Sequence, residues 1–289
     1  MYLQIRPPVD LKNLISFFYV MELEEKEKLK QPLLPSLTPI MGWQYKGFWE
    51  IRARRFGNKE EKWILPEFYT VGQQTVSYTL RTVKGTAGIM GAALHPDALW
   101  QMFNKPVKPF TNVTVSTTEL FDKALIDNTV AAFKKSETEE KRLEVLVQFY
   151  RTVNKNISAR YTPVRDAVDI IFQERGAVGV KQIAGKMRLN ERYLQRYFNT
   201  IIGLTPHQYI QMVRFNNIFI ELTKPQDKQN LRDLAVFYNY YDLPHFNKEF
   251  KKYFGFPPSG FILDNFILLR DLIQDTPYLL EVQKQHLRK

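Results

Sequence analysis

Polar and basic side chains recur at helical spacing in two stretches of the last third of the chain. They form the outward faces expected of two short helices: Arg192, Gln195, Arg196 and Asn199 in the first stretch, and His245, Asn247, Lys248, Lys251 and Lys252 in the second. Glutamine and asparagine amides can pair with adenine edges, arginine with guanine, and lysine suits phosphate. These residue types at this spacing indicate a surface that contacts DNA.

The two stretches are copies of one unit. Phe198, Gly203, Pro206 and Tyr209 recur as Phe250, Gly255, Pro258 and Phe261, each 52 residues further along the chain. Matched spacing of this kind predicts a duplicated supersecondary unit.

Each copy predicts a helix-turn-helix unit. First helices at 180–187 and 231–238 place Ala184 and Ala235 where the helices cross, and a small residue is needed there because crossing helices approach to about 8–10 Å. Asn190 suits the start of the second helix of the first copy, as Asp242 does in the second copy. Gly203 and its counterpart Gly255 stand where these helices end in left-handed backbone.

The apolar residues of these helices predict one buried stripe in each copy. The stripe of the first copy consists of Tyr193, Leu194, Tyr197, Phe198 and Ile201, and that of the second of Phe246, Phe250 and Phe254. Between the copies, residues 206–222 are apolar enough to form a buried helix. A rigid helix there would hold two reading helices in successive major grooves, about 34 Å apart.

At these residues the chain resembles the AraC/XylS family of bacterial transcription regulators. The resemblance covers about 165–261 and is most specific at 193–198, 203–209 and 245–258. It implies a seven-helix DNA-binding domain whose helices read successive major grooves. Carried over by position, the base-reading residues are Arg192, Gln195, Arg196, Leu243, Asn247 and Lys248.

Three residues depart from the family pattern. Arg188 and Asn239 stand where turn glycines are usual, and asparagine tolerates left-handed backbone better than arginine does. Pro244 lies early in the second reading helix and leaves fewer polar atoms for bases. We therefore expect the first copy to read bases and the second to contact mainly phosphate.

The first 115 residues read as β-rich, with apolar-aromatic runs such as 14–20 and 75–80 between loops. Helices follow from about Ser116, with a helix start at 117–120. A stripe of Leu143, Leu146, Val147 and Tyr150 either packs on its own domain or forms a dimer seam. Pro163 suits the first turn of a new helix.

These patterns predict an α+β fold. A β-rich sensor or dimerisation domain with helices at its C-terminal end covers 1–157, an all-α domain with two helix-turn-helix units covers 158–261, and a helical tail covers 262–289. Residues 88–99 and 118–121 are loosely similar to the small β-rich domain that precedes this module in some AraC-type proteins. In the family such domains sense ligands or mediate dimers.

Composition narrows the function. The net charge of +11, with 15 basic and 9 acidic residues over 160–260, suits a polyanionic partner. The chain has no cysteine, which excludes disulfides, thiolate zinc sites and cysteine nucleophiles. Its four histidines are far apart, and phosphate-loop and nucleophile-elbow motifs are lacking. We expect no catalytic residue, no metal and no cofactor.

Seven aromatic residues of the β-rich part either line a ligand pocket or form ordinary core. They are Trp43, Tyr45, Phe48, Trp49, Trp63, Phe68 and Tyr69. The sequence favours core, and identifies no effector-binding residue.

The sequence predicts a cytoplasmic, sequence-specific transcription regulator, activator or repressor, and not an enzyme. Double-stranded DNA is the expected partner. RNA polymerase, a small-molecule effector and a second copy of the chain are further candidates, and no membrane is expected, since no apolar run is long enough to span one. Two alternatives stay open: a ligand-binding or interaction protein with a degenerate DNA-binding module, favoured by Leu243 and Pro244, and an enzyme fused to a DNA module, which the lack of cysteine disfavours for alkyl transfer.

Overall fold

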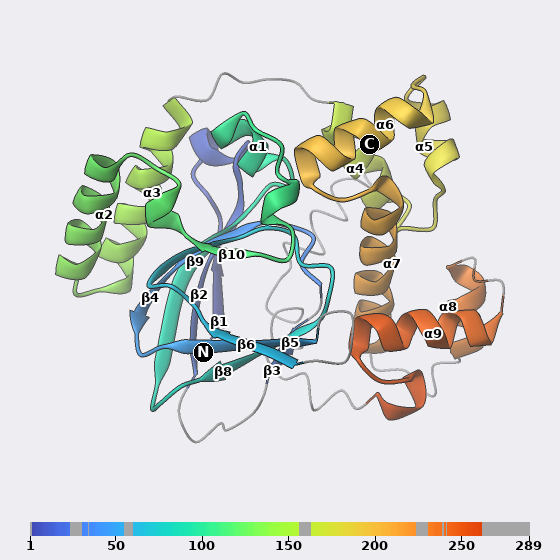
Figure 1. Cartoon of the computed structure of the whole chain (residues 1–289), viewed down its shortest axis with the longest axis horizontal. Coiled ribbons are helices and arrows are strands. Elements are labelled where there is room, and N and C mark those ends of the chain that lie inside the picture. The colour runs from blue at the N-terminus through green and yellow to red at the C-terminus, as the bar shows by residue number, and fades with distance from the viewer. Residues whose placement is uncertain are drawn as a thin grey trace.

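A computed structural model of the protein describes residues 2–23, 31–33, 35–54, 60–155, 163–223, 231–238, 240 and 242–261. The N-terminal part is built on β-sheets and the C-terminal part on helices, and the two parts lie side by side (Figure 1). This is the α+β arrangement that the sequence predicts.

The strands of the described residues form two antiparallel sheets. The larger has the order β1 (Tyr2–Ile5), β2 (Ile15–Leu23), β9 (Ala87–Leu94), β4 (Ile40–Lys46), β7 (Phe68–Val71) and β10 (Thr114–Ser116). The smaller has the order β3 (Gln31–Leu33), β8 (Tyr78–Thr82), β5 (Trp49–Arg54) and β6 (Glu60–Ile64). Of the two apolar-aromatic runs predicted from the sequence, 14–20 lies almost wholly in β2, whereas 75–80 only overlaps the start of β8.

The larger sheet is buried on both faces, because helices cover one face and the smaller sheet covers the other. Successive side chains of a strand point to opposite faces, so Phe18 and Val20 of β2 lie in the core toward the helices, and Tyr19 and Met21 lie in the core between the sheets. This explains why β2 is apolar without interruption from Phe17 to Met21.

Helices α2 (Lys123–Lys135) and α3 (Glu139–Lys155) cover the outer face of the larger sheet (Figure 1). Trp43 stacks between Phe68 and Phe133, with ring centroids 4.7 and 4.2 Å away. The predicted stripe on α3 packs into this core, with Leu146 and Tyr150 buried. Of the two interpretations of this stripe, packing on its own domain or a dimer seam, the structure supports the first.

Two short elements correct the sequence-based boundaries in this part. A helix, α1 (Ala98–Phe103), and a 3-10 turn, η2 (Lys108–Phe110), interrupt the region that was expected to be β-rich. Residues Thr117–Glu119 form only a 3-10 turn, and α2 begins at Lys123 instead. The reason is that the Asp122 side chain caps α2, accepting hydrogen bonds from the backbone N–H groups of Ala124 and Leu125.

The C-terminal part contains six α-helices among its described residues: α4 (Pro163–Gln173), α5 (Val180–Lys186), α6 (Glu191–Tyr197), α7 (Pro206–Thr223), α8 (Leu231–Phe237) and α9 (Leu243–Phe254). A π-helical turn, η4 (Phe198–Ile202), prolongs α6, and a 3-10 turn, η5 (Pro258–Gly260), follows α9. The helices lie where the duplicated motif predicts them. The expected tail, 262–289, lies outside the described residues.

One continuous core joins both helix pairs. Helix α7 runs between α4–α6 and α8–α9 (Figure 1), and its Tyr209 packs edge-on against Phe198 of the first pair. Farther along α7, Phe215 stacks on Tyr253 of α9 with ring centroids 4.3 Å apart. The two pairs are therefore fixed to the same rigid helix.

One expected core residue is at the surface. Tyr193 was expected in the buried stripe of α6, but its side chain is 51% exposed. Leu194, Phe198 and Ile201 already fill the inner face, at spacings of four and three residues. Because Tyr193 directly precedes Leu194 in the helix, its side chain points away from that stripe. The prediction that Tyr193 is buried was therefore wrong.

The turn between α5 and α6 contains a strained residue. Arg188 has φ of 54°, the left-handed conformation that the missing turn glycine would adopt freely. Asn239, the other departure, lies outside the described residues.

Replacing Arg188 by glycine should stabilise the protein. Left-handed backbone costs a non-glycine residue about 1–2 kcal/mol, and the flexibility of glycine offsets roughly 0.5–1 kcal/mol of the gain. We expect urea denaturation of Arg188→Gly to give a free energy of unfolding about 0.5–1 kcal/mol higher. Arg188→Ala, which keeps the strain, is the control, and equal stability of the two variants would show that the backbone at this turn is not strained.

Candidate nucleic-acid interface

Helix α6 presents the polar face that the sequence predicts. Its start is fixed by the Asn190 side chain, which accepts a hydrogen bond from the backbone N–H of Arg192 at 2.8 Å. Burial of Leu194 turns the opposite side outward, and Arg192, Gln195 and Arg196 are exposed there. These three side chains can reach a ligand as large as a duplex.

Two contacts shape this face of α6 further. The guanidinium group of Arg196 lies 5.0 Å from the ring centre of the exposed Tyr193 and 5.7 Å from that of Tyr197, close enough for cation–π attraction. Asn199 is only half-buried, and its amide donates to the backbone carbonyl of Gln195 at 2.9 Å. Asn199 is thus partly committed to its own helix.

Helix α9 presents a basic face. The Asp242 side chain accepts from the backbone N–H of His245 at 2.7 Å and so fixes the start of the helix. The residues predicted for its outward face are all exposed: His245, Asn247, Lys248, Lys251 and Lys252. Leu243 is half-buried against the helical core, so little of its side chain is presented to a partner.

The outer face of α9 is cationic because its one acidic residue points inward. Glu249 is half-buried; one carboxylate oxygen accepts from the Gln211 amide at 2.7 Å, and the other from the Tyr240 hydroxyl at 3.2 Å. No carboxylate of α9 therefore opposes the ammonium groups of Lys248 and Lys251. Such a face is complementary to a phosphate backbone.

The far end of α6 is attached to the β-rich part. Val107 donates its backbone N–H to the Thr200 carbonyl at 3.0 Å, and the Thr111 hydroxyl donates to the Gly203 carbonyl at 3.0 Å. Gly203 has φ of 83°, and a Cβ there would lie 2.6 Å from the Thr111 hydroxyl oxygen. The chain can pass this close only because residue 203 has no side chain.

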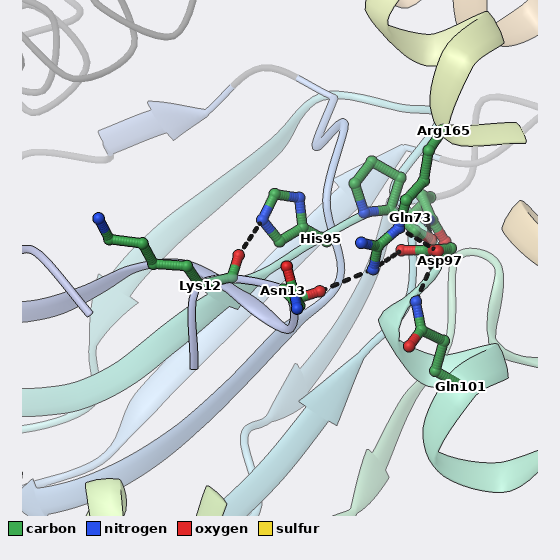
Figure 2. A network of polar contacts seen from close by, with 8 residues as sticks. Lys12, Asn13, Gln73, His95, Asp97, Gln101 and Arg165 are labelled. Carbon is green, nitrogen blue, oxygen red and sulfur yellow. Dashed lines mark hydrogen bonds and ion pairs between the residues drawn. The ribbon is translucent and has the colours of Figure 1, made fainter. Parts of the chain in front are cut away.

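Helix α4 is attached to the β-rich part through a buried carboxylate (Figure 2). Asp97, directly before α1, is 2% exposed. The Arg165 guanidinium donates to both carboxylate oxygens, at 2.7 and 3.1 Å, and to the Asn13 carbonyl at 2.7 Å. Gln101 of α1 donates to the same carboxylate at 2.7 Å. We call Asp97, Arg165, Gln101 and Asn13 the domain joint.

His95 lies beside the joint, and its Nε2 is 2.8 Å from the carbonyl oxygen of Lys12 (Figure 2). Burial lowers the pKa of His95, and the positive charge of Arg165 lowers it further. The imidazole is therefore neutral at a lower pH than an exposed histidine would be. No pattern in the sequence identifies the joint, since Asp97 and Arg165 are 68 positions apart.

A cavity of about 330 Å³ opens between the two sheets beside the joint. For seven aromatic residues the sequence leaves two interpretations, pocket lining or core. Of these, Trp63 and Tyr69 line the cavity, whereas Trp43, Trp49 and Phe68 are buried in the cores. The hydroxyl of Tyr45 donates to Glu22 at 2.7 Å, and Phe48 is 55% exposed. The interpretation as core holds for Trp43, Trp49 and Phe68 and that as pocket for Trp63 and Tyr69, whereas Phe48 fits neither.

The described residues contain no group of three or more histidine and carboxylate side chains that could hold a metal ion. Within the same ranges, none of the helices is both long and apolar enough to cross a membrane.

Two family models match the chain. One, described as a helix-turn-helix domain, matches residues 183–262 and so runs from α5 through both helix pairs. The other, a domain of unknown function, matches residues 3–116 of the β-rich part. No curated protein matches the chain.

Solved structures that the chain matches include ToxT from Vibrio cholerae, with 10% identity and a TM-score of 0.44 over 84% of this chain and 96% of that one. ToxT from Vibrio cholerae O395 bound to (E)-4-(8-methylnaphthalen-1-yl)but-3-enoic acid has 14% identity and a TM-score of 0.44, over 92% and 99% of the two chains. The AraC-like transcriptional activator CuxR has 13% identity and a TM-score of 0.25, over 71% and 74%.

The two cap glycines should respond differently to substitution. Both have left-handed backbone, as predicted, with φ of 83° at Gly203 and 85° at Gly255, but a Cβ at Gly255 would meet no atom within 4 Å. We expect Gly255→Ala to lower the free energy of unfolding by about 1–2 kcal/mol, the cost of left-handed backbone alone. Gly203→Ala should cost more, because the methyl group also pushes Thr111 away. Urea denaturation measures both, and equal losses would contradict the close approach at Gly203.

Proposed function

The chain belongs to the AraC/XylS family of helix-turn-helix transcription regulators, and on that premise we propose that α6 and α9 are its two DNA-reading helices, entering successive major grooves of one duplex. The protein is a DNA-binding transcription regulator. What supports two reading helices is their common attachment to α7: one core holds both, while their polar faces stay exposed.

The two helices differ in the chemistry that they offer. Helix α6 carries two guanidinium groups and an amide, on Arg192, Arg196 and Gln195, which can form paired hydrogen bonds with base edges. Helix α9 carries lysines, with Leu243 half-buried and Pro244 in its first turn. We therefore assign sequence reading mainly to α6 and phosphate contact mainly to α9, with Asn199, Leu243 and Asn247 as weaker candidates.

The β-rich part, residues 1–157, is proposed as the regulatory domain, and residues 158–261 as the DNA-binding domain. Contacts of the β-rich part supply a route for regulation, since this part holds α4 through Asp97 and the end of α6 through Thr111. A small-molecule effector that moved this part would change the position of α6. A second copy of the chain and RNA polymerase are the protein partners that this role calls for.

The same features of α9 favour one alternative function. With Leu243 half-buried and Pro244 lacking a polar side chain, the module would bind DNA without reading its sequence. The protein would then act through its ligand or its protein partners. Selection of bound sites from random duplexes, at a stated salt concentration, decides between the two: one enriched motif supports the regulator, and no enrichment supports the alternative.

The division of labour between α6 and α9 predicts different effects of their substitutions on binding. Each phosphate contact contributes about 0.9 to the slope of log affinity against log salt. Lys251→Ala and Lys252→Ala should each lower that slope by up to about 0.9 and leave the preferred sequence unchanged. Arg196→Ala should cost about 1–3 kcal/mol on the selected site and relax the preference at one base pair.

The control for these lysines is Lys123→Ala, which also removes an exposed ammonium group, but from α2, far along the chain from α6 and α9. Its salt slope should equal that of the parent protein. A changed sequence preference in the Lys251 or Lys252 variant, or an unchanged slope in both, would contradict the assignment.

A further inference from the structure

The cavity between the sheets is lined by residues of both parts of the protein. The larger sheet contributes Tyr19 and Ile89, and the smaller sheet Ile51 and Leu80. One side is closed by α4, through Val168 and Phe172, and by Asn216 of α7. Its volume of about 330 Å³ falls at the lower end of the range for small-molecule sites.

The described wall of this cavity is apolar and aromatic and holds no lysine or arginine. Seven aromatic side chains line it: Tyr2, Phe17, Tyr19, Trp63, Tyr69, Tyr78 and Phe172. Apart from the tyrosines, its ionisable groups are His95 and Asp169, both toward α4. A bound carboxylate would be a buried charge without a cation and would face Asp169, and an unpaired buried charge is strongly unfavourable.

One polar feature inside the cavity is a pair of tyrosine hydroxyls. The hydroxyl oxygens of Tyr19 and Tyr69 are 3.1 Å apart, and they rest against the strands at Gly42 and Gly91. A Cβ at Gly42 would lie 2.4 Å from the Tyr69 hydroxyl, and one at Gly91 would lie 2.7 Å from that of Tyr19. The two glycines therefore make the room that this pair occupies.

The pair keeps one hydrogen for a ligand. Two hydroxyls carry two hydrogens, and their mutual bond uses one of them. Burial raises the pKa of Tyr19 and of Tyr69, and raises that of Tyr78, on the same wall, to about 12. These groups are protonated at neutral pH, so the cavity offers a neutral hydrogen-bond donor in apolar surroundings.

We propose that this cavity binds a neutral aromatic molecule of about two rings, which accepts a hydrogen bond from the Tyr19–Tyr69 pair, and that it rejects carboxylates. Flat rings fit a wall of aromatic side chains, and the single donor selects a carbonyl or ring-nitrogen acceptor. The further assignment of this cavity as the effector site of a regulator rests on the proposed function.

A ligand bound in this cavity would contact the DNA-binding part directly. Besides α4, the loop at 35–38 lines the cavity and contacts α7: the Tyr209 hydroxyl donates to the Leu37 carbonyl at 3.3 Å, and the Asn216 amide to that of Pro35 at 3.5 Å. A molecule in contact with this loop, Val168 and Phe172 touches the two helices that support α6.

The test is calorimetric titration of the full chain, without DNA, with three bicyclic probes. Coumarin is neutral with a carbonyl acceptor, coumarin-3-carboxylate adds a negative charge, and naphthalene lacks the acceptor. We expect coumarin to bind at least tenfold more tightly than its carboxylate and several-fold more tightly than naphthalene.

Two variants locate the site. Tyr19→Phe combined with Tyr69→Phe should weaken coumarin binding about five- to tenfold and leave naphthalene binding unchanged, because both hydroxyl hydrogens are lost and the rings remain. Ala93→Leu, which fills the cavity, should weaken binding of both probes, and a thermal melt confirms that it is folded. The matched control is Tyr253→Phe, since Tyr253 is buried in the helical core, where its ring stacks on Phe215, and does not line the cavity.

No binding of coumarin up to its solubility limit, tighter binding of the carboxylate, or equal coumarin affinity for the parent and both cavity variants would overturn the proposal. Because the titration contains no DNA, its result is independent of the proposed function. Coumarin binding of the expected pattern in a protein that selects no DNA motif supports the cavity and contradicts the regulator. Motif selection without coumarin binding contradicts the cavity alone.

Discussion

The arrangement of the two parts depends on one buried negative charge. The Asp97 carboxylate is withdrawn from water, and an unpaired charge in such a place destabilises a protein by several kcal/mol. Its cationic partner is Arg165, on the first helix of the C-terminal helical part, which donates to both carboxylate oxygens. The β-rich part can satisfy its own interior charge in this way only while α4 is docked on it.

The position of α6 follows from that constraint. Helix α4 shares a core with α5, α6 and α7, so fixing α4 fixes α6, the first of the two proposed reading helices, as well. Contacts of Val107 and Thr111 hold the far end of α6 to the same surface. Through α7 the constraint reaches α9, because Phe215 stacks on Tyr253. The cavity lies against this chain of contacts, since α4 forms part of its wall.

The sequence predicts the helical part better than the joint or the cavity. Local features determine those helices: capping side chains at Asn190 and Asp242, and left-handed glycines at 203 and 255. The aromatic residues of the sheets could not be divided in advance. Both faces of the larger sheet are buried, so alternation does not distinguish Trp43, in the core, from Tyr69, on the cavity wall. Asp97 and Arg165 meet only through the tertiary fold, and no spacing rule relates them.

The Asp97–Arg165 pair holds the two parts together, and a double-mutant cycle on the free energy of unfolding tests this role most directly. Arg165→Met leaves the buried carboxylate unpaired and should cost about 3–5 kcal/mol. Adding Asp97→Asn to that variant removes the charge and should restore most of the loss. If the two substitutions instead add to within about 0.5 kcal/mol, the side chains act independently, and the joint does not fix α4.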